Sequence, residues 1–175
     1  MFNLGDGIFR QRMGWAYVRY KAYALYPKLF FMQTNHISKM KVLFETDQLI
    51  IEHEFESAFL IDKSSGKKVV SDDFYGDPEC GLISSNNDWA IIAGEHLTAW
   101  RKSVPEEDQL VRIENEDLQL IKEMRLKTQD TIEILIDPWS EKSVIWEMNI
   151  NDLSYKKIKD FPNSQETKYT DKIDW

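Results

Sequence analysis

The chain has 175 residues, of which 42% are hydrophobic and 13% aromatic, and its formal net charge at pH 7 is −8. This composition excludes an intrinsically disordered chain, and the length suits a single domain with a sizeable core. The one cysteine, Cys80, excludes an internal disulfide and favours a reducing compartment. No run approaches the roughly 20 apolar residues of a membrane-spanning helix, and no signal peptide is recognisable, so we expect a cytoplasmic protein.

The charge is unevenly distributed along the chain. Residues 1–43 contain seven basic residues and a single acidic one, Asp6, so the remaining residues carry a net charge of −14. An acidic body disfavours binding to nucleic-acid phosphates and favours fast capture of a basic partner. The alternative is an ordinary surface charge that keeps the protein soluble.

The first predicted element covers residues 15–26, before Pro27. As a helix, this segment would place Trp15, Val18 and Ala22 on one stripe; as a strand, its side chains would alternate between two faces. Three alanines and the absence of isoleucine and threonine favour the helix. Its arginines and tyrosines could stack on nucleic-acid bases, but an amphipathic element with solvated basic side chains is favoured.

From residue 37 onward the sequence favours short strands separated by turn signals. Their spacing of roughly 8–12 residues is typical of an all-β sandwich, barrel or meander. Strands with tryptophan that alternate with turns are also typical of propellers, although a full propeller needs a longer chain. The expected segments are 39–45, 49–55, 58–62, 68–70, 81–84, 89–93, 96–100, 110–114, 118–127, 131–136, 144–150 and 153–161.

One of these segments, 118–127, is ambiguous because Leu118, Ile121 and Met124 also have a helical spacing. The surrounding strands and the lack of a glycine cap favour a strand. We therefore predict a mainly β fold, an antiparallel sandwich or curved meander of about ten short strands with an N-terminal helix. One β-rich domain is expected over residues 1–161, followed by a polar, flexible tail at 162–175.

The centre of the chain predicts a hairpin, because the apolar runs 89–93 and 96–100 flank Gly94 and Glu95. A glycine in the first position of a two-residue loop predicts a type II′ turn with Ala93 opposite His96. Both faces of this hairpin are largely apolar, so we expect it inside the sheet system. The predicted faces are Trp89, Ile91, Thr98 and Trp100 on one side, and Ala90, Ile92, Leu97 and Ala99 on the other.

Three carboxylates recur with period two, at Glu52, Glu54 and Glu56, so one strand would place them on one face. They form either a solvated face or a docking stripe for arginine or lysine of another protein. A glycosidase needs two carboxyls that face each other across a cleft, which this pattern does not favour.

Four further acidic residues, Asp72, Asp73, Asp77 and Glu79, surround the aromatic residue Tyr75 in the central loop. An exposed aromatic side chain among carboxylates is a candidate protein-binding hot spot. The alternative, that the aromatic residues of this loop fold into the core, stays open. The loop lacks the alternating oxygen ligands and closing glutamate of a calcium loop.

Signals for catalysis, metal binding and cofactor binding are missing from the sequence. The three histidines, His36, His53 and His96, have no metal-binding spacing, and His53 lies on an apolar face where a hydrogen-bonded core histidine is usual. Nucleophile motifs, a phosphate-binding loop and a dinucleotide loop are absent. Asp77 and Glu79 would raise the pKa of Cys80, which disfavours a thiolate nucleophile. We expect a non-enzymatic protein without metal or cofactor.

The central stretch, with residues 74–78, 81–83, Trp89 and 94–95, resembles a pattern in bacterial immunity proteins of contact-dependent growth inhibition and related toxin systems. The resemblance covers residues 72–100, about a sixth of the chain, and carries over no site residues. It implies a cytoplasmic protein that binds one cognate toxin domain, often a nuclease, and blocks its active site.

These observations together predict a binding protein whose partner is a basic toxin domain, with no direct contact to nucleic acid or membrane. The alternatives are an enzyme with a carboxylate pair, such as a carbohydrate-active protein, and a structural or assembly subunit. The expected partner-binding residues are Glu52, Glu54, Glu56, Asp72, Asp73, Tyr75, Asp77 and Glu79.

Overall fold

The computed structural model describes residues 40–162, 164, 166, 168–170 and 173–175. Contacts divide the chain into two units, Met1–Ser38 and Lys39–Trp175, and the described residues all lie in the second. The helix expected at residues 15–26 lies outside the described residues. Within the described part, no helix is long and apolar enough to cross a membrane.

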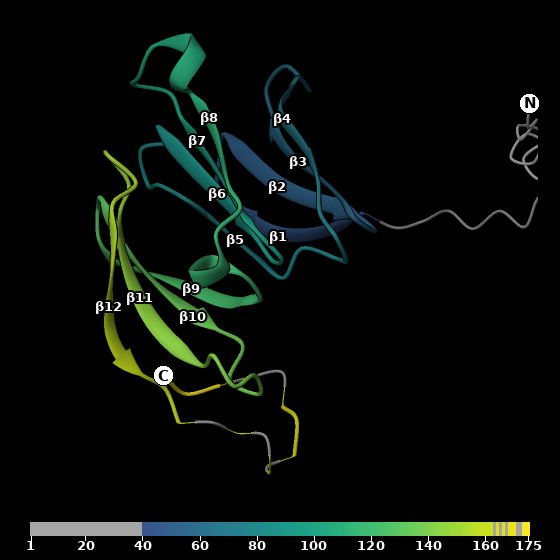
Figure 1. The fold of residues 1–175 in the computed structure, drawn as a ribbon. Coiled ribbons are helices and arrows are strands. Elements are labelled where there is room, and N and C mark those ends of the chain that lie inside the picture. Colours follow the sequence, from purple (N-terminus) through teal and green to yellow (C-terminus); the bar gives the residue numbers. More distant parts are fainter. Residues whose placement is uncertain (1–39, 163, 165, 167, 171–172) are drawn as a thin grey trace, which may run out of the picture. The chain divides into compact units, whose positions relative to one another are not determined.

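In residues 40–162, twelve strands form three four-stranded sheets, which confirms the prediction of a mainly β, antiparallel fold (Figure 1). In each sheet the strands pair with their neighbours in chain order, as in a meander. The described part also contains two short 3₁₀ helices, η1 (Glu106–Asp108) and η2 (Glu116–Leu118), and most of the ambiguous segment 118–127 forms a strand, as predicted. The strands of sheet 1 are β1 (Lys41–Glu45), β2 (Leu49–Glu54), β3 (Ser57–Asp62) and β4 (Lys68–Asp73). Those of sheet 2 are β5 (Cys80–Ile83), β6 (Trp89–Ala93), β7 (Leu97–Arg101) and β8 (Leu110–Ile113). Those of sheet 3 are β9 (Ile121–Thr128), β10 (Thr131–Ile136), β11 (Val144–Asn149) and β12 (Tyr155–Asp160).

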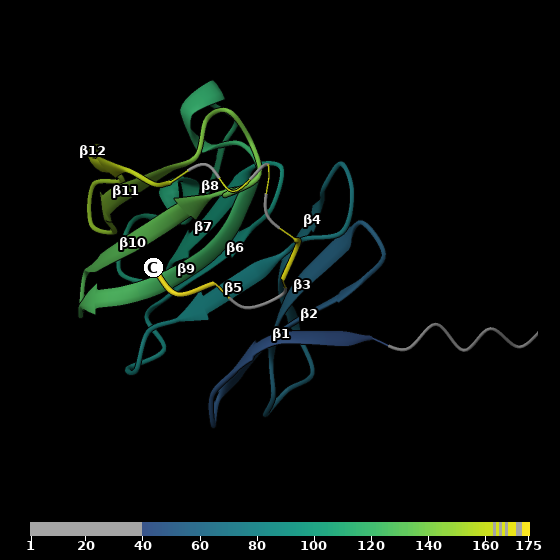
Figure 2. The same cartoon turned by 90° about the horizontal axis from the view of Figure 1, so that it is seen from below.

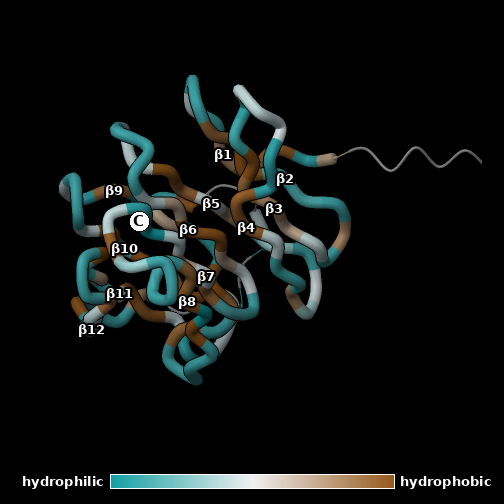
Figure 3. The backbone as a smooth tube through the Cα atoms, turned by 90° about the horizontal axis from the view of Figure 1, so that it is seen from above, coloured by the Kyte–Doolittle hydropathy of each residue, from teal (hydrophilic) through white to brown (hydrophobic). Residues whose placement is uncertain are grey.

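Sheet 2 lies between the other two sheets (Figures 1 and 2), and its central strands β6 and β7 are buried on both faces. All five residues of β6 are buried, and successive side chains enter different cores because strand side chains alternate. Ala90 and Ile92 pack with sheet 1, whereas Trp89, Ile91 and Ala93 pack with sheet 3. Figure 3 shows hydrophobic segments gathered where the sheets meet. The expectation that this hairpin lies inside the sheet system is confirmed.

Sheet 1 has one core face and one outer face. In β2, Leu49, Ile51 and His53 are buried, and the residues between them are only partly buried. His53 is 3% exposed, and its Nδ1 atom lies 2.9 Å from the carbonyl oxygen of Phe55. The interpretation of His53 as a hydrogen-bonded core histidine is therefore confirmed.

The β6–β7 hairpin differs from the prediction by one residue. Ala93 pairs with Leu97, so the loop has three residues, 94–96, instead of two. Gly94 does not have a positive φ, and the predicted type II′ turn is wrong. The shift turns β7 over, because moving a strand by one residue exchanges its faces. Leu97 and Ala99 now share the core with Trp89 and Ile91, while Trp100 packs in the other core with Ala90 and Ile92.

His96 explains the longer loop. Its ring stacks on Phe74 with 3.9 Å between ring centroids, and its Nε2 atom lies 2.9 Å from Oδ2 of Asp72. Thr98 donates a hydrogen bond to the same carboxylate, and Arg112 donates to its other oxygen at 2.9 Å. These contacts join β4 to β7 and β8. His96 makes them from the loop, because it is not paired with a residue of β6.

Trp175 lies against the outer face of sheet 3. Leu135 and Ile145 are paired on neighbouring strands, are 0% and 1% exposed, and belong to neither of the two cores. Trp175 donates from its indole nitrogen to Glu123, the residue opposite Leu135, at 2.8 Å. Its ring also lies 4.2 Å from the guanidinium carbon of Arg125. The Trp175 side chain therefore contacts β9 of sheet 3.

Candidate functional site

A groove of about 310 Å³ lies where the β4–β5 loop, the β6–β7 hairpin and the start of β9 meet. We call it the acidic groove, because four of its lining residues are acidic. It brings together three of the eight residues that the sequence predicted for partner binding, Tyr75, Asp77 and Glu79. Its other lining residues are Gly76, Gly94, Glu95, Leu120, Ile121, Lys122, Asp137 and Tyr169.

One wall of the acidic groove is the loop that follows β4. Phe74 is 4% exposed and its backbone N–H donates to the carbonyl oxygen of Glu56 at 2.9 Å. Because Phe74 is held in the core, Tyr75 projects outward, and it is 86% exposed. Gly76 follows with φ of +88°, a conformation that suits glycine. The sequence left open whether the aromatic residues of this loop are exposed or fold into the core. In the structure, Phe74 lies in the core and Tyr75 is exposed to solvent.

The floor of the acidic groove depends on Gly94. A Cβ atom at this position would lie 3.2 Å from the Cα atom of Pro78, so the hairpin tip touches the β4–β5 loop closely. The carbonyl oxygen of Gly94 accepts a hydrogen bond from the N–H of Ile121 at 2.8 Å, which fixes the start of β9 beside the hairpin. One small residue therefore joins three segments that are distant in sequence.

Two of the four groove carboxylates are paired and two are not. Asp77 forms an ion pair with Lys41 at 3.1 Å, and Glu79 forms one with Lys122 at 2.9 Å. Among the described residues, Glu95 and Asp137 have no ion-pair partner. The Asp137 carboxylate accepts a hydrogen bond from the backbone N–H of Trp139 at 3.0 Å. No described lysine or arginine therefore neutralises these two carboxylates.

Lys122 is the basic residue that lines the groove. Its ammonium group donates to Glu79 at 2.9 Å and to the hydroxyl oxygen of Tyr169 at 2.8 Å. Burial opposes its charge, but the hydrogen bonds with Tyr169 and Glu79 outweigh burial and raise the pKa of Lys122 above its usual value. The side chain therefore remains a cation and is unsuited to act as a nucleophilic amine.

Apolar surface is also concentrated in the acidic groove. Tyr75, Leu120 and Tyr169 all line it, and each is among the large hydrophobic residues that remain exposed. Leu120 has a positive φ of 57°, which is unusual for a branched side chain. The groove thus offers apolar contact area beside unpaired carboxylates.

Cys80 is adjacent to the groove but is not a nucleophile. Burial raises the pKa of its thiol above the usual value, and the carboxylates of Glu79 and Glu123 raise it further. The sequence also predicted a raised pKa for Cys80, from the carboxylates of Asp77 and Glu79. In the structure, Glu123 has the effect that was expected of Asp77. The cysteine therefore stays protonated.

The acidic stripe on sheet 1 is shorter than predicted. β2 ends at Glu54, so Glu52 and Glu54 lie on the outer face of the strand while Glu56 lies in the following turn. The prediction that all three share one strand face is wrong, because Phe55 adopts a positive φ of 52° and turns the chain. Glu56 instead accepts the N–H of Gly76 at 3.3 Å and supports the groove loop.

Asp72 and Asp73 have different environments. The Asp72 side chain is 13% exposed, and both of its carboxylate oxygens accept hydrogen bonds within the protein. Burial opposes ionisation, but the hydrogen bonds from Thr98 and His96 outweigh it and lower the pKa of Asp72. Asp73 is exposed and accepts a hydrogen bond from Ser57 at 2.7 Å. Asp72 therefore links two sheets, and Asp73 is the accessible member of the pair.

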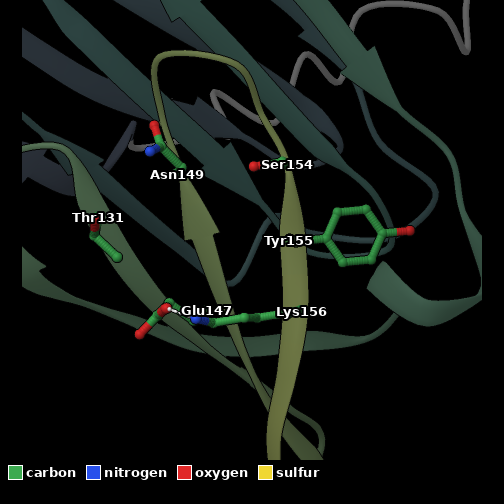
Figure 4. A pocket seen from close by; sticks show the side chains of 6 residues that line it. All are labelled: Thr131, Glu147, Asn149, Ser154, Tyr155 and Lys156. Atoms are coloured by element: carbon green, nitrogen blue, oxygen red, sulfur yellow. Dashed lines mark ion pairs between the residues drawn. The ribbon is translucent and has the colours of Figure 1, made fainter.

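A second pocket, of about 240 Å³, lies on sheet 3 beside the β11–β12 hairpin (Figure 4). Its Glu147 forms an ion pair with Lys156 at 2.9 Å, which Figure 4 shows as a dashed line, and another with Lys127. The charges of this pocket are thus satisfied within the sheet. The remaining lining residues are Thr131, Asn149, Ser154 and Tyr155. Within residues 40–162 and the described tail positions, no group of three His, Cys, Asp or Glu could hold a metal ion.

No protein-family model and no curated protein matches the chain. Among solved structures, it is similar to the WD40 β-propeller domain of Doa1, with 8% identity and a TM-score of 0.44 over 63% of this chain and 36% of that one. It is also similar to the RRP9 WD40 repeats, with 12% identity and a TM-score of 0.46 over 69% of this chain and 41% of that one. For Kuenenia stuttgartiensis hydrazine synthase the identity is 9% and the TM-score 0.45, over 73% of this chain and 38% of that one. The chain spans about two fifths of the length of these structures.

Proposed function

We propose that the chain is a protein-binding module that captures a basic segment of a partner protein in the acidic groove. One observation carries this proposal. The exposed side chains of Tyr75 and Leu120 line the same groove as Glu95 and Asp137, which have no ion-pair partner among the described residues.

The two kinds of side chain would contribute differently to binding. Aromatic residues near the centre of an interface supply much of the affinity, which makes Tyr75 the expected anchor. Carboxylates around such an anchor mainly speed the encounter with a basic partner and select against acidic ones. Neither Lys122 nor Cys80 is activated as a nucleophile, and a binding role needs no such group.

The partner that we propose is a basic toxin domain, which the resemblance to immunity proteins implies. A nuclease has a basic substrate-binding surface, and an acidic groove with an aromatic anchor complements such a surface. In this proposal the chain neutralises the toxin by covering its active site.

The test is capture from the native cell lysate at low and high salt, with the wild-type chain and with a Glu95→Lys/Asp137→Lys variant as bait. The wild type should retain a basic protein at low salt, and the variant should lose it. With the purified partner, the association rate of the variant should fall by at least about ten-fold, with a flatter salt dependence.

A matched control carries the same charge change elsewhere. Glu106 and Glu107 are exposed in η1 and do not line the groove, so Glu106→Lys/Glu107→Lys should affect association much less. Equal effects of the two variants would reject the groove as the binding site. The captured protein should lose its nuclease activity when mixed with the chain, and retained activity would reject neutralisation.

A further inference from the structure

The acidic groove already holds an aromatic side chain from a distant part of the sequence. Tyr169 lines the groove, and its ring lies 4.6 Å from the ring of Trp139, tilted by 41°. Its hydroxyl oxygen accepts a hydrogen bond from Lys122 at 2.8 Å, and the Lys122 ammonium nitrogen lies 5.3 Å from the ring centroid. Tyr169 thus makes three kinds of contact, two with Lys122 inside the groove and one with Trp139 beside it.

These contacts define a site for a tyrosine side chain. Trp139 offers an aromatic surface, and Lys122 offers both a cation near the ring and a donor for the hydroxyl group. Glu79 holds Lys122 in position by its ion pair, so the donor is oriented before any ligand arrives. A phenylalanine would fit the same surface but would leave the Lys122 donor without this acceptor.

The occupant is only partly enclosed. Tyr169 is 55% exposed, so an equivalent side chain of another molecule could take its place without entering the core. The residue before it is Lys168, which is exposed. The unpaired carboxylates Glu95 and Asp137 line the same groove and would attract a basic residue next to an incoming tyrosine.

We infer that the acidic groove recognises a protein segment with a tyrosine beside a basic residue, and that Tyr169 occupies the tyrosine part of this site within the free chain. The inference rests on the proposed function, because it names the kind of segment that the partner presents. Binding of the partner would then compete with the chain's own Tyr169.

The test uses the full chain and the peptide acetyl-Gly-Lys-Tyr-Thr-Lys-Gly-amide, with binding followed by NMR titration of the indole and amide signals. The Tyr169→Ala variant should bind this peptide at least about ten-fold more tightly than the wild type, because its site is vacant. Replacing the peptide tyrosine by phenylalanine should weaken binding several-fold, and replacing it by alanine should abolish it.

A Trp175→Ala variant is the matched control, because Trp175 contacts Arg125 and Glu123 and does not line the groove. This variant should bind the peptide as weakly as the wild type does. Equal binding by Tyr169→Ala and wild type, or equal binding of the tyrosine and alanine peptides, would overturn the inference.

The basic-partner proposal is tested separately by a peptide with serine in place of both lysines. If the tyrosine is required but the lysines are not, the tyrosine site stands and the basic partner is rejected. If the lysines are required but the tyrosine is not, the tyrosine site is rejected and the basic partner stands.

Discussion

Both carboxylate oxygens of Asp72 are used for contacts within the fold. Its two oxygens accept hydrogen bonds from Thr98 and Arg112, and the His96 ring completes the contact. A buried carboxylate is stable in this setting only while its donors are in place. The sequence grouped Asp72 with the partner-binding residues because its neighbours are acidic, but the carboxylate itself contacts sheet 2.

We predict that Asp72→Asn lowers the free energy of unfolding at pH 7 by about 1–3 kcal/mol, since it removes charged hydrogen bonds from a largely buried site. The lowered pKa of Asp72 means that its contribution is complete above the pKa of the unfolded state, about 3.9, and is lost as pH falls through the folded pKa. The difference between variant and wild type should therefore shrink below pH 4, as urea denaturation would measure. Asp73→Asn, at the exposed neighbour, should change stability little.

Cys80 provides a second prediction for a single residue. Burial raises the pKa of its thiol, and the Glu79 and Glu123 carboxylates raise it further. We expect the folded chain to react with Ellman's reagent at pH 8 at least about ten-fold more slowly than the urea-unfolded chain. Equal rates would contradict this placement of the thiol.

The elements could be predicted from the sequence more completely than their contacts. Alternation of apolar residues located β2, and the expected segments 58–62 and 68–70 are joined by a turn in which Gly66 has a φ of +70°. The β6–β7 register failed because it depends on His96, whose partners Phe74 and Asp72 lie about twenty residues away. No local pattern carries that information.

The acidic groove was predicted in part for the same reason. Tyr75, Asp77 and Glu79 are close in sequence, so one loop revealed them together. Glu95 was predicted only as part of the hairpin loop, Asp137 follows the expected segment 131–136, and Tyr169 lies in the predicted tail. These residues meet through the packing of β9 against the hairpin, which requires the three-dimensional fold.

At the level of one strand, β2 allows a test of the second acidic surface. Glu52 and Glu54 lie on the outer face of sheet 1, away from the groove residues. If this stripe also contacts the basic partner, Glu52→Lys/Glu54→Lys should slow association and flatten its salt dependence. Stopped-flow measurements at two salt concentrations would detect the change. An unchanged rate would restrict binding to the groove.

For the whole molecule, the prediction of a mainly β, antiparallel fold is confirmed, but the arrangement in three separate meanders was not foreseen. Hydrophobic patterns indicate that a strand is buried without telling which sheet covers it. In β6 the apolar residues 89–93 form one continuous run, and only the structure assigns alternate residues to different cores.

The burial of the central strands of sheet 2 on both faces has a consequence for cooperativity. Each face of sheet 2 packs against a different neighbouring sheet. If one neighbour unfolds, sheet 2 is destabilised, and its packing against the other neighbour is weakened as well. Among the described residues, the buried strand members of one core come from sheets 1 and 2 and those of the other from sheets 2 and 3, with the partly buried Phe44 of β1 packed against both, so each core uses the same β6 strand. Local opening of sheet 2 would therefore expose both cores at once, so its amide hydrogens should be the last to exchange with solvent. We therefore expect unfolding in this part of the chain to be all-or-none, even though it consists of three consecutive sheets.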